Sequence, residues 1–234
     1  LLLLLLITFF YLFSSSSSLF FILLSSSNFK IDFASSAGAA LLDDVHAAKD
    51  AAMVQLLKQA HGIPFGKTNV PEWAATWITI NPTNGRTANP YGAHLTAGGS
   101  SGGSGAAVAF HMGPVAITED TAGSTRHPAY QNHNFGYDPS SNHYPNEGNP
   151  AISVYQDQVG LNARTLDDVL LVDAALLGTT DAHAAARARA AAAPPLRIGL
   201  PRFPFVDFDL PPDAALPFPP GLLRSFPISP NIKA

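Results

Sequence analysis

Apolar side chains recur at helical spacing in two stretches of the chain. Residues 37–60 carry an apolar residue at every third or fourth position and a glycine soon after the last, which predicts an amphipathic helix. The second pattern begins at Thr165, whose capping box with Asp168 marks a helix start, and it ends before Gly178. Both helices are expected to lie with one face on a core.

Short apolar runs without a helical period predict strands. Residues 115–118 form such a run, and it ends at an acidic pair. Across 61–74, two prolines and two glycines exclude a long element and predict a short strand and a turn that presents Lys67. The sequence LRIGL at 196–200 predicts another strand, and the alanine-rich stretch 182–193 before it a helical linker.

Polar, turn-rich sequence separates these elements. Residues 77–97 and 130–150 show little periodicity and are expected to be irregular loops. Between them, residues 98–103 contain only glycine and serine and run into the small, apolar stretch 104–110. This order predicts a loop that leads into the N-terminus of a helix, where unpaired backbone N–H groups point outward.

The two ends of the chain differ in composition from the middle. Residues 1–36 begin with thirteen uncharged, mostly aliphatic and aromatic residues, followed by serine blocks. This length suits a signal-peptide core and is short for a membrane span, but no basic residue precedes it and the repeats are of low complexity. We therefore exclude 1–36 from the fold, expect one domain over 37–201, and expect an irregular proline-rich tail over 202–234. Membrane association is expected only through residues 1–24; the protein is secreted or anchored if that leader acts in targeting, and cytoplasmic otherwise.

Composition excludes several classes of function. The net charge is −4 with no basic stripe, so nucleic-acid binding has no electrostatic support. Cysteine is absent, which removes disulfides, thiolate nucleophiles and zinc–thiolate sites. The eight histidines include no His-x-x-x-His pair with a neighbouring glutamate. A metal site is therefore not expected.

Two serines in glycine-rich loops, Ser100 and Ser124, are candidate nucleophiles. A serine nucleophile needs a base and hydrogen-bond donors for the oxyanion. The nearby histidines are His111 and His127, and a third candidate base is Lys67, whose mainly apolar surroundings could lower its pKa. On composition alone, Lys67 is equally well a surface lysine in a loop.

Three blocks of sequence carry a specific resemblance. They read GIPFGKTNVPEWA at 62–74, TAGGSSGGSGAAVA at 96–109 and EDTAGSTRHPA at 119–129. In order and spacing they resemble the three signature blocks of the amidase signature family, and a weaker likeness extends the match to residues 38–201. The resemblance implies an α/β fold with a mixed β-sheet flanked by helices. It also implies C-terminal truncation, because family members usually continue for another couple of hundred residues.

The resemblance also implies roles for individual residues. Lys67 is similar to the catalytic lysine, Ser100 to a relay serine whose peptide bond is cis, and Ser124 to the serine that forms an acyl-enzyme with a small carboxylic amide. No metal or organic cofactor is implied. The oxyanion hole would be formed by the backbone N–H groups of Thr121, Ala122, Gly123 and Ser124.

Supporting roles in the implied site fall to Asp120, Arg126 and Ser101, the first two as groups that brace the nucleophile loop. One residue departs from the family pattern. The family commonly has two glycines before the nucleophile, and this chain has Ala122 and Gly123. A positive φ angle at Ala122 would strain the oxyanion loop by about 1 kcal/mol.

Several other interpretations stay open. HGIPFGKT resembles a phosphate-binding loop, but its glycines are one position too close together. Gly99, Ser101 and Gly103 match the G-x-S-x-G pattern of an α/β-hydrolase-type esterase, although AHLTA before them is a poor buried strand. The chain can also be an inactive amidase-like fragment or scaffold. A glutamine-dependent tRNA amidotransferase component of the same family is less well matched, since KTNVPEWA looks more like the free-standing amidases.

Overall fold

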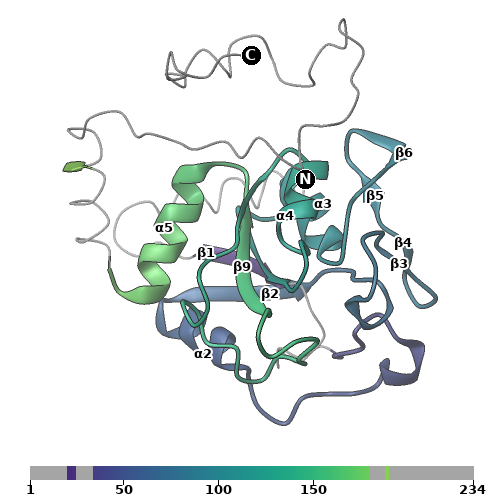
Figure 1. The fold of residues 1–234 in the computed structure, drawn as a ribbon, viewed down its shortest axis with the longest axis horizontal. Helices are drawn as coiled ribbons and strands as arrows, with labels where there is room; N and C mark the ends of the chain where they lie inside the picture. Colours follow the sequence, from purple (N-terminus) through teal and green to yellow (C-terminus); the bar gives the residue numbers. More distant parts are fainter. Residues whose placement is uncertain (1–19, 25–33, 180–187, 190–234) are drawn as a thin grey trace, which may run out of the picture. The chain divides into compact units, whose positions relative to one another are not determined.

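The computed structural model describes residues 20–24, 34–179 and 188–189 (Figure 1). All but the last two belong to one compact unit, Leu1–His183, and the remainder of the chain forms a second unit. The expected strand at 196–200, the domain end at 201, the proline-rich tail and most of the alanine-rich linker lie outside the described residues.

A five-stranded mixed sheet forms the centre of the first unit. Its order is β2 (Gly62–Lys67), β1 (Phe20–Leu24), β7 (Val115–Asp120), β9 (Gln158–Ala163) and β8 (Phe135–Tyr137). Strand β1 runs parallel to both of its neighbours, whereas β9 is antiparallel to β7 and to β8. The expected α/β architecture with a mixed sheet is therefore confirmed.

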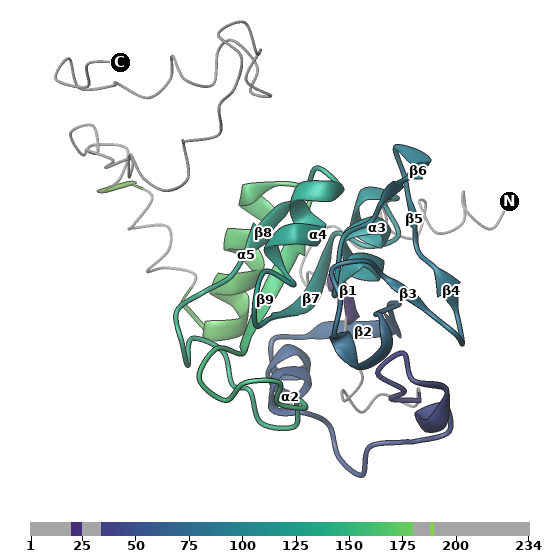
Figure 2. The same ribbon diagram turned by 45° about the vertical axis from the view of Figure 1, so that its right-hand side comes forward.

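Helices cover both faces of this sheet. Helices α2 (Ala52–Gln59) and α5 (Leu166–Leu177) share one core with the sheet, which includes Val115 and Ile117 of β7. Helix α3 (Gly102–Ala109) packs on Ala116, which lies between Val115 and Ile117 in β7. Helix α3 also contacts α4 (Arg126–Gln131). Because successive strand residues point to opposite faces, the two pairs of helices lie on opposite sides (Figure 2).

The expectation that residues 1–36 lie outside the fold is wrong for β1. This strand lies between β2 and β7, and its Ile22 and Leu24 side chains are buried in the larger core. Its sequence, FFILL, is a continuous apolar run, which is typical of a parallel strand covered on both faces. Local composition does not reveal a partner strand, so the sequence alone groups this run with the low-complexity residues around it.

The helix expected over 37–60 is confirmed only at its end, as α2. Upstream lies one 3₁₀ turn, Ala40–Leu42, and the side chain of Leu41 is 87% exposed. Ala37 and Gly38 have left-handed φ angles of 51° and 70°, and a Cβ on Gly38 would lie 2.5 Å from the Val70 carbonyl oxygen. This close approach of two backbones fixes a non-helical path that the apolar spacing does not reveal.

The two expected loops also contain short elements. Residues 77–97 form two small antiparallel ribbons, β3 (Ile80–Asn81) with β4 (Gly85–Arg86), and β5 (Ala88–Asn89) with β6 (Gly92–Thr96). Residues 130–150 include the end of α4 and β8. The Asn84–Gly85 pair at the first ribbon is a common hairpin signal and could have predicted it.

Other expectations agree with the structure. Thr165 caps α5 by accepting a hydrogen bond from the Asp168 N–H, and Gly178 ends the helix in a left-handed conformation. The glycine/serine loop leads directly into α3, and the strand at 115–118 extends to Asp120. Within the described ranges, no helix is both long enough and apolar enough to cross a bilayer.

Candidate active site

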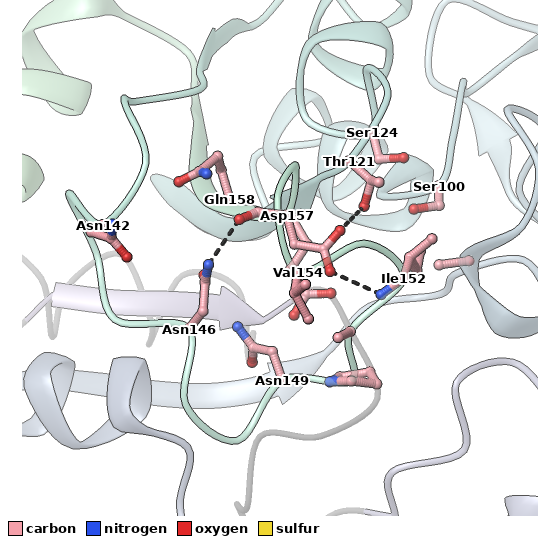
Figure 3. A pocket seen from close by; sticks show the side chains of 14 residues that line it. Ser100, Thr121, Ser124, Asn142, Asn146, Asn149, Ile152, Val154, Asp157 and Gln158 are labelled. Atoms are coloured by element: carbon pink, nitrogen blue, oxygen red, sulfur yellow. Dashed lines mark hydrogen bonds between the residues drawn. The ribbon is translucent and has the colours of Figure 1, made fainter.

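Ser100 and Ser124 line one cavity of about 290 Å³ at the end of β7 (Figure 3). Their loops precede α3 and follow β7, so two separate segments of the chain meet here. The main-chain N–H of Ser101 donates to the carbonyl oxygen of Ser124 at 3.3 Å, which joins the two loops directly. The structure thus brings together the two serines that the sequence singled out.

The conformation of the Ser100 loop is held by Thr79. Its hydroxyl lies 2.8 Å from the Gly98 carbonyl oxygen and 3.2 Å from that of Ser100, and it accepts from the Gly102 N–H at 3.1 Å. Thr79 is itself buried. The peptide bond between Gly99 and Ser100 is cis, as the family resemblance implies.

Helix α3 begins pressed against the segment after β2. The N–H of Gly103 donates to the Asn69 carbonyl oxygen at 3.0 Å, and the Thr68 and Ser104 hydroxyls lie 2.7 Å apart. A Cβ on Gly103 would lie 2.3 Å from the Asn69 nitrogen. The glycine is therefore needed for the close approach of the first and second signature blocks.

Asp120 holds the Ser124 loop in shape. Its buried carboxylate accepts from the N–H groups of Gly123 at 2.6 Å and Thr125 at 3.0 Å, and the Arg126 guanidinium donates to both oxygens at 2.9 and 3.1 Å. Burial opposes ionisation of this carboxyl, but Arg126 and the two N–H groups outweigh it and lower the pKa of Asp120. The contacts are those expected of a loop-bracing pair.

The contacts of Asp120 reduce the number of N–H groups that can form the oxyanion hole. That of Gly123 is directed to Asp120 Oδ1, which leaves Thr121, Ala122 and Ser124 as the candidates. The positive φ angle of the loop, 112°, falls on Gly123, and Ala122 is not among the described non-glycine residues with a positive φ. The alanine is thus accommodated without the anticipated strain.

Ser101, the alternative nucleophile, is almost fully buried and is not among the described residues that line the cavity. Its hydroxyl points to the Glu119 carbonyl oxygen at 3.5 Å. The strand before it, β6, belongs to a two-stranded ribbon outside the main sheet. The strand-to-helix elbow of an α/β-hydrolase is therefore not formed at this serine.

Lys67 ends β2 and lines a separate, larger cavity of about 770 Å³. Its ammonium group donates to the Ser35 hydroxyl at 2.6 Å and to the Ala34 carbonyl oxygen at 3.2 Å. Burial lowers the pKa of Lys67 to about 8. Lys67 is not among the described residues lining the cavity of the two serines.

Sequence reasoning missed two groups of residues around the serines. Thr79 lies in a stretch expected to be an irregular loop, where no periodicity singles it out. The far wall of the cavity comes from residues 142–158 and is organised by Asp157, whose carboxylate accepts from the Thr121 hydroxyl and the Ile152 and Ser153 N–H groups (Figure 3). An aspartate just before a strand is a weak signal by itself.

Histidine, aspartate and glutamate side chains form no group of three suited to a metal ion in the part of the chain that the structure describes. The cavity is lined instead by hydroxyl, carboxamide, carboxyl and aliphatic groups. Such a lining can bind a polar organic molecule and present a hydroxyl nucleophile to it.

Comparison with known proteins decides the family. The family model described as Amidase matches residues 27–216, which is more than half of the chain. The chain belongs to the amidase family. Its α/β fold is the amidase fold.

Amidase relatives include curated sequences and solved structures. The chain is 37% identical over 162 residues to the A subunit of glutamyl-tRNA(Gln) amidotransferase from Corynebacterium jeikeium, covering 66% of this chain and 32% of that protein. An amidase family protein from Bacillus anthracis superposes with a TM-score of 0.65 at 28% identity, over 70% of this chain and 35% of that one. The corresponding amidotransferase protein from Thermotoga maritima gives 0.64 at 28% identity, over 66% and 34%. The chain spans about a third of the length of these relatives.

Proposed function

We propose that this amidase hydrolyses small carboxylic amides through an acyl-enzyme on Ser124, with Ser100 and Lys67 as a proton relay. The observation that carries the proposal is the shared cavity, which two serines from separate signature blocks line together. The family match supports amide hydrolysis in general.

The proposed chemistry begins with proton transfer toward Lys67. Neutral Lys67 takes the proton of Ser100, Ser100 takes that of Ser124, and the Ser124 oxygen attacks the amide carbon. The resulting oxyanion accepts hydrogen bonds from N–H groups of the loop 121–124. The protons return to the leaving amine as the carbon–nitrogen bond breaks, and water then releases the carboxylic acid.

Two features support these assignments. Asp120 and Arg126 fix the backbone of the nucleophile loop, and a rigid loop keeps donors in place for a developing charge. The lowered pKa of Lys67 leaves a useful fraction of the side chain neutral near pH 8. The step from Lys67 to Ser100 rests on this pKa and on the resemblance of the first sequence block. All of the proposed steps use side chains and backbone of the protein, without a cofactor.

A second candidate is the release of ammonia from glutamine. It is favoured by two relatives that are named as A subunits of glutamyl-tRNA(Gln) amidotransferase. This chain is 37% identical to the one from Corynebacterium jeikeium and 39% identical to the one from Treponema pallidum. The same nucleophile would serve both reactions, so the two candidates differ in the amide rather than in the mechanism.

Turnover of model amides tests the proposal. The 234-residue chain is incubated with p-nitroanilides of short carboxylic acids and with glutamine, and release of p-nitroaniline or ammonia is followed. We expect activity that Ser124→Ala abolishes and that Ser101→Ala largely retains. Loss with Ser101→Ala alone would support the esterase-type alternative. A folded wild-type chain that turns over none of these amides would contradict the proposal and favour the inactive scaffold.

A further inference from the structure

We infer that Asp157 is a positioning residue that couples the acyl-binding wall of the cavity to the oxyanion loop. The inference deepens the proposed function and rests on it for its kinetic consequences. Its structural basis is a single carboxylate that holds two different loops on either side of the cavity (Figure 3).

On one side, Asp157 holds the wall. Its Oδ2 accepts from the N–H groups of Ile152 at 2.8 Å and Ser153 at 2.9 Å, and the Asp157 N–H donates back to the Ser153 carbonyl oxygen at 2.9 Å. The Asn146 amide group donates to the Asp157 carbonyl oxygen at 2.8 Å. These bonds close a turn that places Ile152 and Val154 in the cavity lining.

On the other side, Asp157 holds the nucleophile loop. The Thr121 hydroxyl donates to Asp157 Oδ1 at 2.5 Å. The antiparallel register pairs Asp120 with Gln158, so Thr121 and Asp157 each lie one residue beyond the paired ends of β7 and β9. The ladder therefore brings the carboxylate to the first residue of the loop that carries Ser124.

An ionised aspartate gives all of its partners a charged acceptor, and hydrogen bonds to a charged group are the stronger ones. Asparagine has the same shape but no charge, and one of its two sites is an NH₂ group that the Thr121 hydroxyl could accept from only by reversing its role. The substitution therefore weakens both sets of hydrogen bonds. Asp157 thus links movement of the wall on acyl binding to movement of the loop that begins at Thr121. Asp157→Asn is expected to disturb the wall and the loop, whereas Thr121→Val is expected to disturb the loop alone.

The test compares acetyl and hexanoyl p-nitroanilides in five forms of the chain. Relative to wild type, Thr121→Val should lower kcat about tenfold for both amides and keep the ratio of their KM values, since one hydrogen bond is lost. Asp157→Asn should lower kcat at least as far and should also change the ratio of the two KM values. Tyr155→Ala, on the same turn but outside the cavity lining and 89% exposed, should match wild type.

The double variant Thr121→Val with Asp157→Asn should have the kcat of Asp157→Asn alone, because both changes break one link. Multiplicative effects on kcat would overturn the coupling. The coupling would also be overturned if Asp157→Asn lowered the melting temperature but left unchanged both kcat, per folded molecule, and the ratio of the KM values for the two amides.

Hydrogen exchange provides a readout that does not need activity. Asp157→Asn should raise amide exchange about tenfold or more in both 121–125 and 150–156, with α5 unchanged, while Thr121→Val should affect 121–125 alone. Exchange that rises only in 150–156 in Asp157→Asn would overturn the inference. A wild-type chain that shows this exchange pattern but hydrolyses no amide would refute the proposed function and keep Asp157 as the structural link.

Discussion

The main-chain N–H of Ser101 donates to the carbonyl oxygen of Ser124 at 3.3 Å, so the residue after one candidate serine holds the other. The two loops are joined by this bond, Thr79 supports the loop of Ser100, and Asp120 supports the loop of Ser124. Perturbing either support should therefore affect both loops, which makes the arrangement open to test by substitution.

Thr79→Val should destabilise the protein and reduce turnover. The substitution keeps the shape of the side chain but leaves the Gly98 carbonyl and the Gly102 N–H without their hydroxyl partner. Loss of such buried partners costs about 1–3 kcal/mol. Urea unfolding measures the change, with Thr76→Val as the control, since the Thr76 hydroxyl bonds the Ile78 carbonyl at an exposed position and its loss should cost less than about 0.5 kcal/mol. Equal losses for the two variants would contradict the role given to Thr79.

Gly103→Ala should be among the most destabilising small changes in the chain. The new methyl group would lie 2.3 and 2.4 Å from backbone atoms of Asn69, which cannot rotate away. Overpacking of this kind costs about 3 kcal/mol or more. Gly178→Ala is the comparison, because its Cβ meets open space and only the left-handed φ of 64° opposes it, at about 1 kcal/mol. Gly103→Ala should therefore melt at a lower temperature than Gly178→Ala. The reverse order would contradict the close packing of α3 on Asn69.

Asp120→Asn should destabilise the protein at neutral pH by about 2–4 kcal/mol, because Arg126 and the loop N–H groups lose their charged acceptor. The pKa of Asp120 is lowered in the folded state. Its contribution to stability is therefore full above the ordinary aspartate pKa and is lost as the pH falls through the lowered value. Urea unfolding of wild type and Asp120→Asn should converge as the pH falls below about 4. A difference that is constant with pH would show that ionisation of Asp120 is not involved.

Lys67 should give the pH–rate profile an acidic limb. With its pKa lowered to about 8, kcat/KM should rise with pH and level off above that value as the amine becomes neutral. The folded pKa lies below the ordinary 10.5, so the stability of wild type should also rise between about pH 8 and 10.5. Lys67→Met should abolish turnover and remove this rise in stability. A pH–rate profile without an inflection near 8 would exclude Lys67 as the base.

Local patterns predicted the elements whose signals are complete within a few residues. Thr165 with Asp168 and Gly178 marked both ends of α5, and the glycine/serine run marked the start of α3. β1 and the path near Gly38 depend instead on contacts with distant segments, namely β7 and Val70. The same holds at the site. The resemblance of the blocks pointed to Ser100 and Ser124, but Thr79 and Asp157 become visible only when the loops that they join lie side by side.

The central claim is that Ser124 is the nucleophile, and the position of a covalent adduct tests it most directly. The chain is treated with a fluorophosphonate, digested, and mapped by peptide mass spectrometry. We expect the adduct on Ser124 in the wild-type chain, and no adduct in Ser124→Ala. An adduct on Ser100 or Ser101, or a folded chain that remains unmodified, would contradict the claim.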